Sequence, residues 1–189
     1  VSAPQRPLVL AFIVVAAACT RAPENAAGYD RSAAAPPSDG KLFSRLPSSY
    51  TGVRFSNDLT ESSDVNVFIY RNFYNGGGVA IGDINNDGLP DLYFTANMGS
   101  NKLYLNKGNF KFEDITKKAG VAAIGGIKTG VSVVDINGDG FQDLYVCRSG
   151  PAPTPDRANL LFVNNGQLGF TEKAAEYGLD DRSASNHAN

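Results

Sequence analysis

One acidic nonapeptide occurs twice in the sequence, and this repetition constrains the fold more than any other feature. Residues 83–91 read DINNDGLPD and residues 135–143 read DINGDGFQD, each followed by Leu-Tyr. The wider windows 78–94 and 130–146 share ten identities in seventeen positions. Such a duplication predicts two copies of one structural module, because repeat proteins stack similar supersecondary units.

The similarity resumes beyond each nonapeptide at a different spacing. Residues 101–121 align with residues 159–179, and the additional residues of the second copy lie in the Pro-rich stretch 148–158. A surface loop tolerates such an insertion. We therefore assign repeat 1 to about 76–121 and repeat 2 to about 128–179, within a folded region of 46–189.

Each repeat has the apolar pattern of four short strands separated by turns. We place the strands of the first repeat at about 79–82, 92–95, 103–106 and 110–114. Short helical turns are predicted over 114–120 and 172–178, between the repeats and after the second. Four strands in about 50 residues are the size of one β-propeller blade. The sequence therefore predicts an all-β fold, a partial propeller of about two four-stranded antiparallel blades.

Two further features bear on the strands. Residues 106–108 (Asn-Lys-Gly) and 164–166 (Asn-Asn-Gly) supply residue types that tolerate positive φ, so we expect hairpin turns there. Residues 50–78 contain apolar and aromatic side chains that are typical of strands. We expect strand-like structure around Val53, Phe55, Val67, Ile69, Tyr70 and Phe73.

The repeated nonapeptide has the pattern D-x-N-x-D-G-x-x-D, which places side-chain oxygens at positions 1, 3, 5 and 9. These residues are Asp83, Asn85, Asp87 and Asp91 in the first copy and Asp135, Asn137, Asp139 and Asp143 in the second. A hard cation with six to eight oxygen ligands would offset the repulsion among three clustered carboxylates. The pattern therefore predicts a calcium (Ca2+) site in each loop.

The remaining loop positions fit the same interpretation. The backbone carbonyl groups of Leu89 and Phe141, at position 7, could each add a ligand, and glycine at position 6 permits a sharp turn. Magnesium is the weaker candidate, because it requires a stricter octahedral geometry. Zinc is not expected, because neither loop contains Cys or His.

The loops admit two other interpretations. An EF-hand requires a bidentate Glu at position 12 and flanking helices, but position 12 is Phe94 or Val146 in an apolar run. Alternatively, the loops are polar turns that close hairpins through Asx hydrogen bonds. The occurrence of two copies in the same strand context favours the metal site.

The unit GVAIGDINNDGLPDLYF resembles FG-GAP or VCBS repeats, which form the blades of integrin α-subunit propellers. In that family the acidic loop joins the first two strands of a blade and binds calcium. The longer stretch 72–106 is similar to bacterial exported proteins akin to cartilage acidic protein, which often end in an ASPIC/UnbV segment. Because those propellers have about seven blades, the resemblance implies that this chain is an N-terminal fragment of a longer protein.

The composition argues against several classes of function. The net charge is −2 and the pI is about 5.4, without a basic patch, so no nucleic-acid partner is expected. The single histidine, His187, lies near the C-terminus, so a Ser-His-Asp or Cys-His catalytic arrangement is not expected. We therefore predict a protein that is not an enzyme. Cys147, in the run LYVC, is expected to be a small buried strand residue.

The N-terminal segment predicts export. Arg6 precedes the apolar run 8–19, which is long enough for a signal-peptide core and too short to span a bilayer. Residues 16–19 (Ala-Ala-Ala-Cys) resemble a lipoprotein box, which makes residues 1–19 a lipoprotein-type signal peptide and Cys19 the lipidated residue. Cleavage after Ala18 without lipidation and a buried core segment are the alternatives. Residues 20–45, rich in Ala, Pro and Ser, predict a flexible linker.

These features together predict an exported calcium-binding propeller protein, located in the outer membrane as a lipoprotein or at the cell surface, or else periplasmic or secreted. Its expected role is adhesion, ligand binding or scaffolding, with an extracellular protein or glycan as partner and membrane attachment only through Cys19. The alternative is the propeller portion of a secreted carbohydrate-active enzyme whose catalytic residues lie elsewhere. A periplasmic assembly factor is a third possibility.

Overall fold

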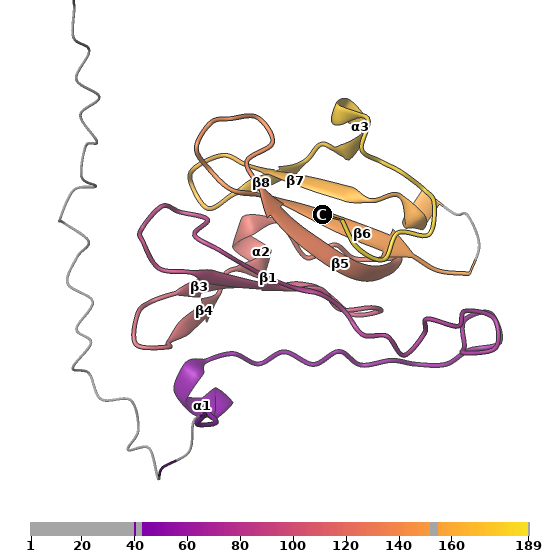
Figure 1. Cartoon of the computed structure of the whole chain (residues 1–189), viewed down its shortest axis with the longest axis horizontal. Helices are drawn as coiled ribbons and strands as arrows, with labels where there is room; N and C mark the ends of the chain where they lie inside the picture. The colour runs from indigo at the N-terminus through magenta and orange to yellow at the C-terminus, as the bar shows by residue number, and fades with distance from the viewer. Residues whose placement is uncertain (1–39, 41–42, 152–154, 189) are drawn as a thin grey trace, which may run out of the picture.

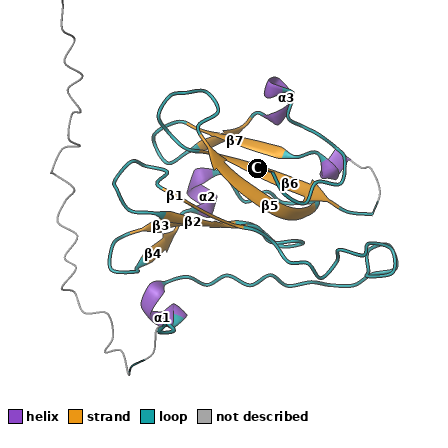
Figure 2. Cartoon of the chain, viewed as in Figure 1, coloured by secondary structure: helices purple, strands orange, loops and turns teal. Residues whose placement is uncertain are grey.

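Two four-stranded antiparallel sheets, one stacked on the other, make up most of the computed structural model, which describes residues 40, 43–151 and 155–188 (Figure 1, Figure 2). The first sheet contains β1 (Val79–Gly82), β2 (Asp91–Phe94), β3 (Lys102–Asn106) and β4 (Phe112–Asp114). The second contains β5 (Ile127–Val134), β6 (Asp143–Ser149), β7 (Leu160–Asn164) and β8 (Phe170–Glu172). The predicted all-β fold with two propeller-type blades is confirmed.

Each sheet is a simple meander, in which every strand pairs with the next one along the chain. The register of β1 and β2 pairs Gly82 with Asp91, so the first acidic loop closes this hairpin directly. In the second blade Val134 pairs with Asp143, which places the second acidic loop at the equivalent position. The strand bounds agree with the sequence prediction to within two residues in the first repeat.

The hydrophobic core lies between the two blades. Residues of alternating strand positions in both sheets form one buried cluster, which includes Ala80, Tyr93, Leu103, Val131, Leu144, Val146 and Phe162. Along β1 the alternation is clear, because Ala80 is buried whereas Val79 and Ile81 on the other face are exposed. Full burial of one of the larger side chains in this cluster, such as Leu103 or Leu144, contributes about 1.5–3 kcal/mol.

Glycine allows the chain that enters β1 to approach β5 closely, and β5 to approach residues 185–188. A Cβ atom on Gly78 would lie 3.0 Å from the carbonyl oxygen of Thr129, in β5. One on Gly130 would lie 2.7 Å from the carbonyl oxygen of Asn186, to which the Gly130 N–H also donates a hydrogen bond of 3.0 Å. Residues 185–188 therefore lie on the second blade in the way that β5 lies on the first.

A hydrogen-bonded Tyr–Asn pair recurs in both blades, fully buried in the first and partly buried in the second. The hydroxyl of Tyr93 donates to the Val121 carbonyl at 2.7 Å and accepts a hydrogen bond from the Asn101 amide at 2.8 Å. In the second blade Tyr145 and Asn159 form the same pair, at 2.9 Å. In the first blade these bonds hold Val121, in the chain that follows β4, against Tyr93 of β2.

Short helices connect or flank the strands. These are α1 (Ser48–Thr51), α2 (Thr116–Ala119), α3 (Ala174–Tyr177) and the 3-10 helix η1 (Pro155–Arg157). The helical turns predicted over 114–120 and 172–178 are confirmed by α2 and α3. Each ends at a glycine in the left-handed conformation, Gly120 and Gly178, which is the usual helix C-terminal arrangement.

The strand-like structure predicted around Val53, Phe55 and within 65–73 is wrong. The segment 43–78 contains α1, turns and irregular backbone but no strand. Its aromatic residues serve packing instead. Phe55 stacks on Phe94 of β2, with ring centroids 4.9 Å apart, so the segment covers part of the face of the first blade that the second blade does not contact.

The signal-peptide prediction for residues 1–19, including Cys19, lies outside the described residues, as does most of the 20–45 linker. Within the described part of the chain, every helix is too short or too polar to cross a membrane.

Candidate functional site

The two acidic loops project from the same end of the two blades (Figure 1). The first occupies 83–90 between β1 and β2, and the second occupies 135–142 between β5 and β6. Both therefore connect adjacent strands of a hairpin and neither is flanked by helices, which excludes the EF-hand arrangement. Phe94 ends β2 and Val146 lies within β6, at the positions where an EF-hand would need its bidentate glutamate.

The first loop is wound around the carboxylate of Asp83. The N–H groups of Asp87 and Gly88 donate to its two oxygens at 3.0 and 2.7 Å. The side-chain amide of Asn85 donates to Asp87 at 2.9 Å, and the Leu89 N–H donates to the other oxygen of Asp87 at 2.9 Å. Residues 1, 3 and 5 of the pattern are thereby gathered on one side of a tight turn.

The second loop repeats this arrangement. Asp135 accepts the N–H groups of Asp139 and Gly140 at 3.1 and 2.9 Å. The side-chain amide of Asn137 donates to Asp139 at 2.8 Å, and the Phe141 N–H donates to Asp139 at 2.8 Å. The Asx hydrogen bonds of the alternative interpretation are thus present in both copies.

Glycine at position 6 is required by the backbone. Gly88 and Gly140 have φ values of 83° and 86°, in the left-handed region that a residue with a Cβ seldom adopts.

The last aspartate of each loop behaves differently from the other two. Asp91 is 1% exposed and Asp143 is fully buried. Asp91 accepts the Ile84 N–H at 3.0 Å and the Asn106 N–H at 2.7 Å, one on each oxygen. Asp143 accepts the equivalent N–H groups of Ile136 and Asn164. These carboxylates fasten the acidic loop to the third strand of the blade.

Burial changes the acidity of these two carboxyl groups. It raises the pKa of Asp91 to about 6, against the opposing effect of the two backbone N–H groups, and the negative charges of Asp87 and Asp83 raise it further. The pKa of Asp143 is raised for the same primary reason, burial. A cation beside either loop would favour the ionised form.

The chemistry of the donor groups fits a hard cation better than any other ligand. Both loops offer carboxylate and amide oxygens and no nitrogen or sulfur ligand. In the first loop Asp83 and Asn85 are partly exposed and Asp87 is exposed, so these oxygens are accessible from solvent. Among the described residues, however, no three Asp, Glu, His or Cys side chains lie together as a preformed metal cluster. The full ligand set, including Leu89, Asp91, Phe141 and Asp143, stays a prediction.

The two loops are also bonded to each other, which the sequence did not predict. The side-chain amide of Asn86 donates to the Gly140 carbonyl at 3.0 Å. The amide of Asn164 donates to the Ile84 carbonyl at 2.8 Å. Asn106 and Asn164 also accept the N–H of Gly108 and Gly166, so they order the hairpin turns through their side chains. The recurrence of asparagine at positions 106 and 164 of the two repeats was the sequence feature that could have indicated this structural role.

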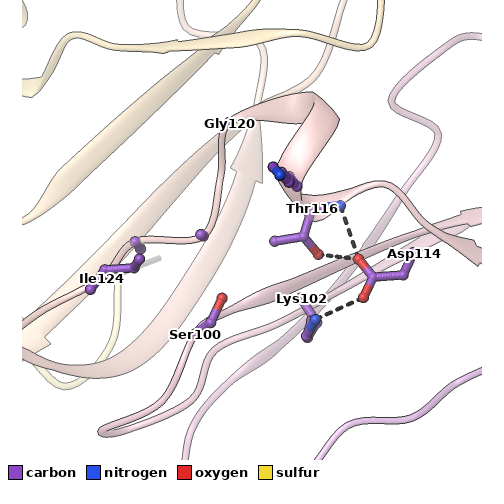
Figure 3. A pocket seen from close by; sticks show the side chains of 9 residues that line it. Ser100, Lys102, Asp114, Thr116, Gly120 and Ile124 are labelled. Atoms are coloured by element: carbon purple, nitrogen blue, oxygen red, sulfur yellow. Dashed lines mark hydrogen bonds and ion pairs between the residues drawn. The ribbon is translucent and has the colours of Figure 1, made fainter.

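A separate polar groove of about 600 Å³ lies beside β3, β4 and α2 (Figure 3). Lys102 forms an ion pair of 2.8 Å with Asp114, and Thr116 donates to the other oxygen of Asp114. The hydrogen bond that Lys102 donates to Asp114 raises the pKa of Lys102, so its ammonium group stays charged at neutral pH. Partial burial tends to raise the pKa of Asp114, but the hydrogen bonds from Lys102 and Thr116 lower it overall.

Cys147 lies in β6 and is 1% exposed, as predicted for a small buried strand residue. Burial raises the pKa of its thiol, which disfavours the reactive thiolate. His187 is exposed.

Comparison with known proteins agrees with the arrangement of the repeats. Residues 83–146, from the start of the first acidic loop into β6, match the model of the FG-GAP-like repeat. Over 127 residues the chain is 32% identical to cartilage acidic protein 1 of Xenopus tropicalis. This alignment covers 67% of the chain and 19% of that protein, so the chain spans about a fifth of the length of this relative.

Proposed function

We propose that this chain, which carries an FG-GAP-like repeat in two propeller-type blades, is a calcium-stabilised module that acts outside the cytoplasm. Its role would be adhesion, ligand binding or scaffolding rather than catalysis. The observation that carries the calcium assignment is the duplication of one oxygen-rich loop in one strand context. Each loop gathers an Asp, an Asn and a second Asp on a tight turn at the same end of its blade.

Asp83, Asn85 and Asp87 would hold the ion in the first loop, and Asp135, Asn137 and Asp139 would hold it in the second. The carbonyl groups of Leu89 and Phe141 and the carboxylates of Asp91 and Asp143 are the further donors. The bound ion would supply positive charge where three carboxylates otherwise repel one another. Its role is therefore structural, because it would hold the hairpin closed.

The expected stabilisation is modest for one loop. If each site binds calcium with a dissociation constant of about 10⁻⁴ M, a concentration of about 1 mM stabilises the folded state by roughly 1.4 kcal/mol per site. Such weak sites are saturated in extracellular fluids and not in the cytosol. This range fits an exported protein, for which the apolar run 8–19 and the Ala-Ala-Ala-Cys sequence ending at Cys19 are the supporting sequence features.

Thermal unfolding of the full chain tests this proposal. We expect the melting temperature to rise when 1 mM calcium is added after chelation, and to rise less with 1 mM magnesium. The variant Asp87→Ala/Asp139→Ala should show no calcium response. Asp64→Ala makes the same substitution at an exposed aspartate outside the loops, and its melting temperature should respond to calcium like that of the unaltered chain. An equal response in all three proteins would refute the assignment of the loops.

A further inference from the structure

The groove beside β3 and α2 has a composition that the fold itself does not require. It is lined by Ser100, Lys102, Asp114, Thr116, Lys117 and Ile124, with small residues between them (Figure 3). The groove lies away from the acidic loops: Lys102 pairs with Phe94 at one end of β2, whereas the first acidic loop precedes Asp91 at the other end.

The polar groups of the groove offer donors to a ligand and leave few acceptors. Both oxygens of Asp114 are occupied, one by Lys102 at 2.8 Å and the other by the N–H and hydroxyl of Thr116. The Thr116 hydroxyl also accepts the Leu103 N–H at 2.9 Å. Lys102 retains two ammonium hydrogens, and Lys117 forms no ion pair within the described residues. The free charge in the groove is therefore positive.

The rim of the groove is aliphatic and is held outward. Ile124 is 82% exposed, although it is a large apolar residue. The preceding Ala123 has a φ of 48°, in the left-handed region that is unfavourable for a residue with a side chain. Ala123 itself packs against the core. The backbone thus anchors one side chain inward and presents the next one to solvent beside the two lysines.

The second blade provides an internal comparison. At the equivalent positions it has Leu160 for Lys102, Ala175 for Lys117 and Arg182 for Ile124. Its single carboxylate Glu172 accepts the N–H groups of Leu161 and Ala174 at 3.2 and 2.8 Å, and so performs the structural task of Asp114 and Thr116 together. A blade of this fold therefore forms without the two lysines and without the exposed isoleucine.

We infer that this groove binds an acidic peptide segment, with a carboxylate between Lys102 and Lys117 and an apolar side chain against Ile124. Charge complementarity identifies the anionic group, and the aliphatic rim identifies the apolar one. A peptide is preferred to a glycan because the described residues that line the groove include no aromatic ring, whose flat apolar face a sugar ring would cover. This inference rests on the proposed role as a binding module but not on calcium.

The test uses two capped hexapeptides, Ser-Glu-Leu-Glu-Leu-Ser and the same peptide with Gln in place of Glu, each titrated into the full chain. We expect the Glu peptide to bind in the submillimolar range and the Gln peptide at least tenfold more weakly. Lys102→Gln/Lys117→Gln should weaken binding of the Glu peptide at least tenfold, and Ile124→Ala should weaken it severalfold. Lys118→Gln removes a neighbouring exposed lysine that does not line the groove, and it should bind like the unaltered chain.

Several outcomes would overturn the inference. These are equal binding of the two peptides, an equal loss in Lys117→Gln and Lys118→Gln, or tighter binding of polygalacturonate that depends on the same lysines. Lys117→Gln alone keeps the test valid if the double variant unfolds in circular dichroism. Two controls separate this inference from the calcium proposal. The loop variant Asp87→Ala/Asp139→Ala should still bind the Glu peptide, and the lysine variants should still show a normal calcium response. Loss of only one of these two activities therefore identifies which proposal has failed.

Discussion

The side-chain amide of Asn86 donates a hydrogen bond of 3.0 Å to the carbonyl oxygen of Gly140, and this bond joins the first acidic loop directly to the second. Asn164 adds a bond from the second blade to the Ile84 carbonyl in the first loop. The loops therefore belong to the interface between the blades. Any change that orders one loop also acts on the packing of the other.

Removal of the Asn86 side chain should weaken this interface. Asn86 has a φ of 58°, so Asn86→Gly removes the amide without straining the backbone, and it reproduces Gly138 at the equivalent position of the second loop. We expect a loss of about 1 kcal/mol in the free energy of unfolding, measured with urea. Asn109→Gly is the matched control, because Asn109 also has a positive φ and no side-chain hydrogen bond is found for it in the described structure. Equal effects of the two substitutions would contradict a role for the inter-loop bond.

The buried carboxylate of Asp91 should make stability depend on pH. Its pKa in the folded state is about 6, above the value of 3.8 for the unfolded chain, so folding favours the protonated form. Its contribution is therefore fully present below pH 4 and is lost as the pH rises through 6. The stability of the unaltered chain relative to Asp91→Asn should fall by about 2–3 kcal/mol between pH 4 and pH 6.

Urea unfolding in the presence of a chelator measures this difference without interference from calcium. Asp181→Asn is the control of opposite sign, because hydrogen bonds from Ser183 lower the pKa of Asp181. Its contribution should be lost as the pH falls. If the difference in stability between the unaltered chain and Asp91→Asn does not change with pH, the backbone N–H groups compensate fully for the burial of Asp91.

Lys128 is a buried cation without a carboxylate partner in the described structure. It is fully buried, its ammonium group contacts only the carbonyl oxygens of Gly125 and Gly126, and Arg148 lies beside it in the strand register. Burial first, and then the charge of Arg148, lower its pKa to about 8. Holding this residue charged at pH 7 therefore costs stability, and the cost disappears as the pH rises from 8 towards 10.5.

Replacement by a neutral side chain of similar length should remove that cost. We expect Lys128→Met to raise the free energy of unfolding by about 1–3 kcal/mol at pH 7 and to have a smaller effect at pH 10. Lys107→Met, at an exposed lysine for which the described structure shows no side-chain hydrogen bond or ion pair, should change it by less than about 0.5 kcal/mol at both values. Destabilisation by Lys128→Met at pH 7 would mean that the two carbonyl contacts outweigh the cost of burying the charge.

The repeat and its strands could be predicted because they depend on local patterns. Alternation of apolar residues in 79–82 and 91–94, and the turn residues between them, are sufficient to place a hairpin. The acidic positions Asp83 and Asp87 could be identified for the same reason, since their spacing in the sequence sets their spacing on the turn.

The features that sequence reasoning missed depend on contacts between distant residues. Phe55 has the apolar side chain of a strand residue, but it stacks on Phe94 from an irregular segment that pairs with no strand of the first sheet. Asp91 carries the same side chain as Asp87, yet it is buried by the third strand of the blade. Only the folded arrangement separates a carboxylate that fastens the loop from one that faces solvent.

Direct titration of calcium into the chelator-treated full chain tests the central claim. Calorimetry should give two calcium ions bound per chain, one in each of Asp87→Ala and Asp139→Ala, and none in the double variant, with Asp64→Ala unchanged. Magnesium should bind more weakly than calcium. Binding of two ions by the double variant, or no binding by the unaltered chain at millimolar calcium, would contradict the assignment of the repeated loops as calcium sites.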